Sequence, residues 1–182
     1  MNSGKSTHLS ISKLYAIAYV VLVVISNLVT IYFKPLNLAG VLIPSSSWFM
    51  GFTFLLINLI SRYENKRFTG SLIWVGLFLT SLICLAQNLP QSLVVASGVA
   101  FWISQQISVI LFKKLSNYYQ SSWVNSCSSF VGSVIDATIW IALGLSPLGI
   151  GTVAYIDIPS AVFGQVVVQF ILQTIASKYL KK

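Results

Sequence analysis

Charge is scarce in this chain of 182 amino acids, since Asp, Glu, Lys and Arg together make up only 8% of it. Soluble domains carry about 25% charged residues, because charged side chains keep their surfaces hydrated. Hydrophobic residues, by contrast, make up 56% of the chain. This composition excludes an ordinary water-soluble domain, a disordered chain and a fibrous repeat, and it predicts a protein with several membrane-spanning helices.

Residues that commonly carry catalysis or bind metals are also few. The chain has one histidine, His8, and two cysteines, Cys84 and Cys127, which lie inside apolar runs and lack Cys-x-x-Cys spacing. We interpret both cysteines as packing residues. A Ser-His-Asp or Cys-His catalytic set would have to be built around His8 in the N-terminal tail. We therefore expect no enzyme, no metal site and no cofactor.

Six apolar runs have the length of a membrane span, for which about 20 residues are needed. They cover residues 14–33, 43–61, 70–87, 93–112, 124–145 and 155–177. The predicted fold class is all-α, a polytopic membrane protein whose residues 1–182 form a single domain, a bundle of six transmembrane helices. The first run lacks an obvious small-residue cleavage site, so we expect it to be a retained helix rather than a signal peptide.

The basic residues predict the orientation of the bundle. Cytoplasmic loops of membrane proteins are enriched in Lys and Arg. If the N-terminus is cytoplasmic, ten of the eleven basic residues fall on the cytoplasmic side and only Lys34 falls outside. Six spans with both termini in the cytoplasm follow from this asymmetry. The net charge of +8 is thus explained by topology, and nucleic acid is not an expected partner.

Asp136 is the acid that the sequence places in the middle of a span. A charged group there costs about 2.5–3.5 kcal/mol on insertion scales. Asn125, Ser129, Gly132 and Asp136 are spaced by four, three and four residues, so they share one helical face. We interpret Asp136 as a binding residue that faces a cavity. A structural hydrogen bond between packed helices is the alternative.

Neutral polar side chains in other spans are candidates for the same site. Gln165 and Gln169 belong to a stripe of amides that repeats every four residues, and the adjacent Gln105 and Gln106 cannot both point the same way. Trp140 lies one turn from Asp136 and could stack on a flat ligand. For the glutamines and the tryptophan, packing remains open as an alternative. The predicted substrate-binding residues are Asp136, Asn58, Gln105, Gln106, Gln165, Gln169, Asn27 and Trp140.

This set of amides, hydroxyls and aromatic rings around one acid suits a small, flat, neutral solute with several donors and acceptors. A guanine-like edge offers adjacent N–H donors that one carboxylate can accept together. The set lacks the many charges expected for an anion, a sugar phosphate or a peptide.

Several segments, in their order and spacing, carry a family resemblance. They are Ile25-Ser26-Asn27-Leu28-Val29, Ile43-Pro44-Ser45-Ser46-Ser47, Gly51-Phe52-Thr53-Phe54, Ala96-Ser97-Gly98-Val99-Ala100-Phe101 with Ser104, Ser129-Phe130-Val131-Gly132-Ser133-Val134-Ile135-Asp136, and Gly164-Gln165-Val166-Val167. In these the chain resembles the queuosine-precursor transporter family, also called the vitamin uptake transporter (VUT) family. The resemblance implies six helices in the cell (inner) membrane and import of 7-cyano-7-deazaguanine or a related deazapurine. It also implies a bundle similar to the membrane substrate-binding subunits of energy-coupling-factor vitamin importers.

The chain departs from the family's pattern at several polar positions. The resemblance implies acids where this chain has Asn58, Ser61 or Arg62, near Gln105 and at Ser108, and a lysine where it has Gln169. Asp136 matches an aspartate that the family retains. Acids and a base are absent together, which keeps the buried charge balanced. We therefore interpret the chain as a divergent member whose solute and energy coupling can differ from the family's.

Other functions fit parts of the pattern. A substrate-binding subunit would need an ATP-driven partner and a coupling surface of small residues, for which Ala96, Gly98 and Ala100 are compatible. Transport of another neutral heterocycle remains open, as does a homo-oligomer. A structural or regulatory membrane protein is disfavoured because the polar residues share helical faces. The expected partners are thus a small solute and the lipid bilayer.

Overall fold

The chain folds almost entirely into helices, as the all-α prediction expected. The computed structural model describes the backbone of residues 3–38, 40–119 and 122–179, and the side chains of 12–38, 40–119 and 123–176. The helices are α1 (Ser3–Tyr32), α2 (Ser47–Tyr63), α3 (Lys66–Ala86), α4 (Gln91–Ser116), α5 (Ser122–Ile139) and α6 (Ile158–Tyr179). A π-helical segment (Trp140–Leu145) continues α5, and a short 3₁₀ turn (Tyr155–Asp157) precedes α6.

Five helices in the described part of the chain are long and apolar enough to cross a membrane. They lie within Ser12–Tyr32, Lys66–Ala86, Gln91–Ser116, Trp123–Leu145 and Tyr155–Ala176. Their length and composition indicate a membrane-embedded protein, and each overlaps one of the predicted spans. The remaining helix, α2, has 17 residues. At 1.5 Å per residue it extends for about 26 Å, slightly less than the hydrocarbon core of about 30 Å.

A β-hairpin precedes the second helix, which begins at Ser47, so the expected start of that helix at residue 43 is wrong. Strand β1 (Leu36–Leu38) pairs antiparallel with β2 (Val41–Ile43). Between the strands, Gly40 has φ +84° and its N–H donates to the Asn37 side chain at 3.0 Å. Pro44 then lacks the N–H that a continuing helix or strand would use. The apolar run in the sequence therefore spans two different elements.

Strand β2 lies directly on α6 near residue 164. A Cβ added at Gly164 would come within 2.5 Å of the Leu42 carbonyl oxygen, so only glycine allows this approach. Non-helical backbone is tolerated at membrane depth when protein buries it. The hairpin thus joins the start of α2 to the last helix of the chain.

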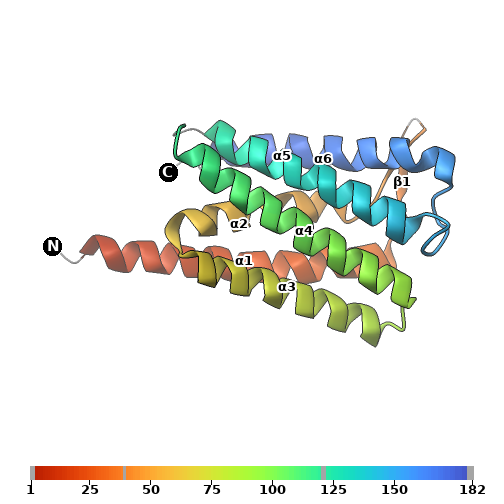
Figure 1. Cartoon of the computed structure of the whole chain (residues 1–182), viewed down its shortest axis with the longest axis horizontal. Coiled ribbons are helices and arrows are strands. Elements are labelled where there is room, and N and C mark those ends of the chain that lie inside the picture. Colours follow the sequence, from red (N-terminus) through yellow and green to blue (C-terminus); the bar gives the residue numbers. More distant parts are fainter. Residues whose placement is uncertain (1–2, 39, 120–121, 180–182) are drawn as a thin grey trace.

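The helices alternate in direction, as the six-span prediction requires. Helix α1 begins and helix α6 ends at the same end of the long axis in Figure 1. The α2–α3 connection lies at that same end, and the described basic residues Arg62, Lys66, Arg67, Lys113 and Lys114 flank it or end α4 there. We call this the basic end. The opposite end, which we call the hairpin end, carries β1, β2 and Lys34.

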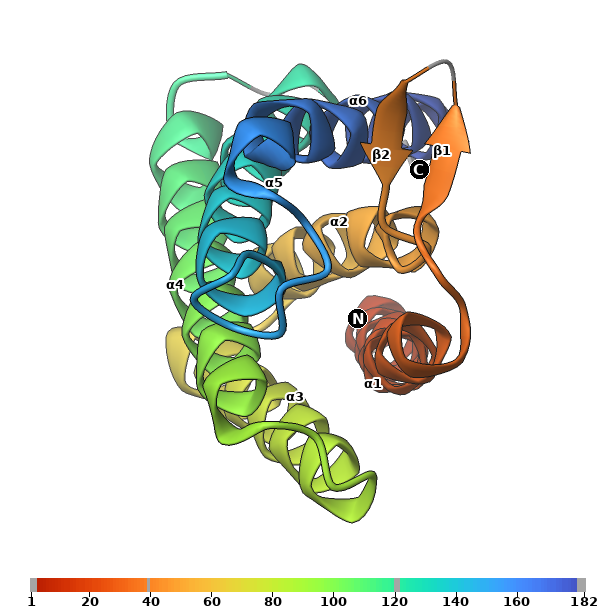
Figure 2. The same cartoon turned by 90° about the vertical axis from the view of Figure 1, so that its right-hand side faces the viewer.

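Helix α2 occupies the centre of the bundle and packs on α1, α4, α5 and α6. In the end-on view it lies between α1 and α6 (Figure 2). Its residues Phe54, Ile57 and Ile60 are fully buried. Glycines permit the closest contacts: a Cβ at Gly51 would lie 3.3 Å from the Gln169 backbone. A central helix surrounded by others can carry polar residues that lipid would not accept.

The small residues Ala96, Gly98 and Ala100 face into the bundle rather than outward. Ala96 and Ala100 are 2% and 1% exposed, and a Cβ at Gly98 would contact Leu77 of α3 at 3.2 Å. They therefore do not form the exposed coupling surface with which the sequence was compatible.

Gly132 of α5 provides a test of this packing. A Cβ there would lie 2.8 Å from the Phe54 ring and 2.9 Å from the Ser108 Cβ, so Gly132→Ala forces α2, α4 and α5 apart. We expect a loss of about 1–3 kcal/mol of stability, as in other overpacked cores. Thermal unfolding in detergent measures it. Gly70→Ala in α3 is the control, because a Cβ there meets nothing within 4 Å; equal melting temperatures for the two variants would contradict the packing.

Candidate functional site: a cavity above a buried aspartate

Asp136 lies on the buried face of α5 and is 3% exposed. The Ser104 hydroxyl of α4 donates to its Oδ1 at 3.3 Å, and the Gln165 amide of α6 donates to its Oδ2 at 3.3 Å. Both partners are neutral, and a carboxylate has about four acceptor positions. Asp136 therefore joins three helices and keeps acceptor capacity for a further donor.

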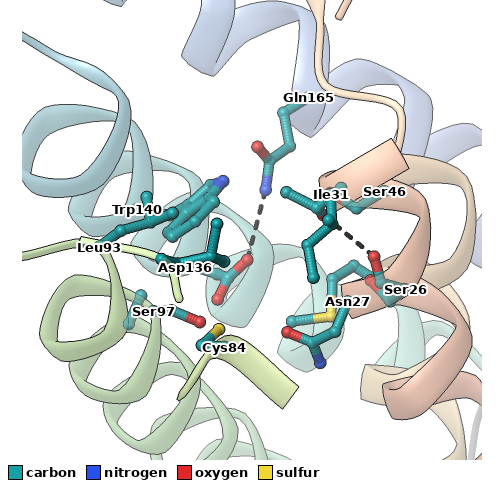
Figure 3. Close-up of a pocket in the computed structure, with 14 residues that line it drawn as sticks. Ser26, Asn27, Ile31, Ser46, Cys84, Leu93, Ser97, Asp136, Trp140 and Gln165 are labelled. Carbon is teal, nitrogen blue, oxygen red and sulfur yellow. Dashed lines mark hydrogen bonds between the residues drawn. The ribbon is translucent and has the colours of Figure 1, made fainter. Parts of the chain in front are cut away.

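A cavity of about 40 Å³ lies beside Asp136 (Figure 3). Its polar lining consists of Ser26, Asn27, Thr30, Ser46, Ser97, Asp136 and Gln165. Its apolar lining consists of Ile31, Met50, Cys84, Leu89, Leu93, Ala100 and Trp140. All six helices thus contribute side chains to one cavity that has a single acid.

The Asn27 side chain is held in place at the wall of this cavity. Its Nδ2 donates to the Val23 carbonyl oxygen at 2.7 Å and to the Thr80 hydroxyl of α3 at 3.0 Å. Since both donor positions are used within the protein, the amide has its oxygen left for a ligand.

A second and larger space lies next to the first. It has a volume of about 340 Å³ and is bounded by Lys34, Pro35, Pro44 and Thr152 among others, so it lies at the hairpin end. We call it the vestibule. A drug-sized ligand needs a pocket of about 300–1,000 Å³, whereas a water molecule needs about 10–15 Å³. The vestibule is thus large enough for a heterocycle, and the Asp136 cavity in this conformation holds about three water molecules.

Half of the eight predicted binding residues line the Asp136 cavity. These are Asp136, Asn27, Trp140 and Gln165. Of the other four, Asn58, Gln105 and Gln169 are fully buried elsewhere in the bundle, and Gln106 is half-buried. The predicted polar face of α5 is confirmed as buried, but only its Asp136 reaches the cavity.

Asn58 belongs to a separate cluster nearer the basic end. Its Nδ2 lies 3.0–3.1 Å from the hydroxyl oxygens of Ser108, Ser128 and Ser129, and Ser108 can donate back to Oδ1 at 3.2 Å. Ser129 precedes Asp136 by seven residues, or about 10 Å along the helix. The hydrogen-bonding positions of the Asn58 amide are thus used by serine hydroxyls of α4 and α5. We therefore assign Asn58 the role of holding α2, α4 and α5 together.

The remaining buried glutamines lie between these two sites. Gln105 donates to the Thr53 hydroxyl at 3.2 Å, and Gln173 donates to the Ser133 hydroxyl at 2.7 Å. Gln169 is fully buried, and neither of its amide atoms has a hydrogen-bond partner among the described residues. Amides and hydroxyls therefore follow one another through the interior from the Asp136 cavity toward the basic end.

Several cavity residues were not among the predicted site residues. Ser46 and Met50 come from the start of α2, whose position depends on a hairpin that the sequence did not reveal. Cys84 was interpreted as a packing residue, and it is buried but also lines the cavity. Among the described residues, no cluster of three His, Cys, Asp or Glu could hold a metal ion.

No protein-family model, curated protein or solved structure matches this chain. The resemblance to a family of transporters therefore rests on sequence segments alone.

Replacing Asn58 tests the structural role of its cluster. Asn58→Ala leaves three buried hydroxyls with fewer partners, and we expect a loss of about 1–3 kcal/mol of stability. The measurement is thermal unfolding in detergent. Gln106→Ala removes a half-buried amide from the neighbouring helix and should have a much smaller effect. If the two variants unfold at the same temperature, the cluster does not stabilise the bundle.

Proposed function

We propose that this protein is a membrane transporter that imports a queuosine precursor, 7-cyano-7-deazaguanine or a similar deazapurine, and binds it at Asp136. The observation that carries the proposal is the buried Asp136 carboxylate, which has two neutral donors and spare acceptor capacity beside a cavity. An acid buried at a cost of about 2.5–3.5 kcal/mol is by default a functional residue in a membrane protein.

The chemistry of the cavity suits the donor edge of a guanine-like base. Such an edge presents two adjacent N–H groups, and the two oxygens of one carboxylate can accept both. The amides of Asn27 and Gln165 supply further polar groups, and the indole of Trp140 supplies a flat apolar surface. Burial makes the bidentate contact selective, because a solute that lacks the donors would leave the carboxylate unpaired.

The proposed orientation places the two ends of the bundle on opposite sides of the membrane. The basic end is the cytoplasmic end in this proposal, by the preference of Lys and Arg for cytoplasmic loops. The vestibule then opens to the outside, the Asp136 cavity lies below it, and the interior amides and hydroxyls continue toward the cytoplasm. A solute entering from outside would meet these groups in that order.

At several positions this chain has neutral residues where the family resemblance implies acids, and these differences favour a neutral solute. Asn58 and Ser108, two positions at which the resemblance implies acids, are hydrogen-bonded to each other. Replacing both acids together removes two carboxyls from one buried contact, and Asp136 remains as the anchor. The proposal therefore assigns binding to Asp136 and no role to proton transfer through the replaced acids.

Rescue of queuosine synthesis in cells tests the proposal. The host lacks its own importer and its own synthesis of the precursor, receives 7-cyano-7-deazaguanine in the medium, and is assayed for queuosine in transfer RNA. We expect the unaltered chain to restore queuosine and Asp136→Asn to reduce uptake about tenfold to a hundredfold, the value of one or two charge-assisted hydrogen bonds. Thr138→Ala, an exposed position on the same helix, should leave uptake unchanged.

Two outcomes would count against the proposal. Full uptake by a stably inserted Asp136→Asn variant would remove Asp136 from the site. Failure of the unaltered chain, at normal abundance in the membrane, would exclude this solute.

A further inference from the structure

The Asp136 cavity and the vestibule meet at a shared layer of side chains. Both spaces are lined by Thr30, Ile31, Leu89, Leu93 and Trp140. Movement of this layer would join a space of about 340 Å³ to one of about 40 Å³. The residue that controls its position therefore controls access to Asp136 from the hairpin end.

Trp140 is the largest side chain in this layer and stands at a break in α5. The α-helix ends at Ile139, and Trp140 begins the π-helical segment that runs to Leu145. In Figure 3 the indole lies beside Leu93, near the Asp136 carboxylate. Single π-turns inside α-helices occur frequently at functional sites. Here the wider turn ends the regular part of α5 at the level of the layer.

Gly144 fixes where the indole lies. A Cβ at this position would be 2.9 Å from Cε3 and 3.0 Å from Cζ3 of Trp140, and 3.4 Å from the Ala96 Cβ of α4. The ring therefore rests on the face of the glycine. The Gly144 carbonyl also accepts the N–H of Ile150 at 3.0 Å, which holds the glycine in place. A side chain at residue 144 would have to displace the ring rather than the backbone.

We propose that the Trp140 indole is the barrier between the vestibule and the Asp136 cavity, and that Gly144 is the positioning residue that sets it. A flat heterocycle binds first in the vestibule, in contact with the indole. It reaches Asp136 when the indole ring moves aside. The identity of that solute rests on the proposed function, whereas the barrier itself does not.

Cys84 supplies a native reporter for the barrier, because it lines the Asp136 cavity and is 4% exposed. The experiment uses the purified full chain with Cys127→Ser in detergent micelles, where both ends of the bundle are accessible, and measures the rate at which trimethylammonium-ethyl methanethiosulfonate modifies Cys84. We expect Trp140→Ala to raise this rate severalfold and Trp140→Phe to raise it less. Labelling after denaturation in detergent confirms that every variant carries the same amount of reactive thiol.

The glycine is tested by a double-mutant cycle. Gly144→Ala should change the rate of Cys84 modification severalfold, because the added Cβ displaces the ring from its position at the passage. In the Trp140→Ala background the same substitution should have no effect, since the ring it displaces is gone. Gly70→Ala should leave the rate unchanged. A rate unaltered by Trp140→Ala would overturn the barrier, and a Gly144→Ala effect that persists without the indole would overturn the positioning role.

The same assay separates the barrier from the identity of the solute. If 7-cyano-7-deazaguanine binds at Asp136, adding it should slow the modification of Cys84 in the Trp140→Ala variant. Rates that respond to residues 140 and 144 but not to the deazapurine would retain the barrier and reject the proposed solute.

Discussion

The bundle depends on keeping its amides and hydroxyls out of lipid. A polar group without a partner costs several kilocalories per mole in hydrocarbon, which favours contacts between polar groups inside the protein. Asn58 meets serines from two other helices, Gln173 meets Ser133, and Asp136 meets Ser104 and Gln165. These contacts fix the rotation of α2, α4, α5 and α6 about their axes, because a helix turned away from its partners would present the same groups to lipid.

Neutral hydrogen bonds replace ion pairs throughout this interior. The partners of Asp136 are a hydroxyl and an amide, so the carboxylate is oriented without being neutralised. An amide such as Asn58 can donate and accept at once, which lets one side chain join three helices. The residues that hold the helices together thus lie apart from those proposed to bind a solute. The Asn58 cluster serves the first role, and the Asp136 cavity is the place for the second.

The sequence predicted the long helices because apolar runs of about 20 residues carry a strong signal. It also predicted the buried face of α5 from spacing, and Asp136 from the cost of an acid in that face. It did not predict the hairpin, since Ile43 and Pro44 were assigned to the start of the second span. Nor could it divide the polar residues between the cavity and the interior clusters. Asn58 and Gln165 look alike as isolated amides, and only helix rotation and depth show that Gln165 alone reaches Asp136.

The central position of α2 has a consequence for how the chain is made. The groups that bind its polar residues come much later in the sequence: Gln105 for Thr53, and Ser108, Ser128 and Ser129 for Asn58. The strand that leads into α2 rests on Gly164 of the last helix. During synthesis, α2 therefore leaves the ribosome well before α4, α5 and α6 exist. The Asn58 amide therefore needs water or the insertion machinery as a partner until α4 and α5 have been made, and the hairpin can pack in place only after α6 has followed.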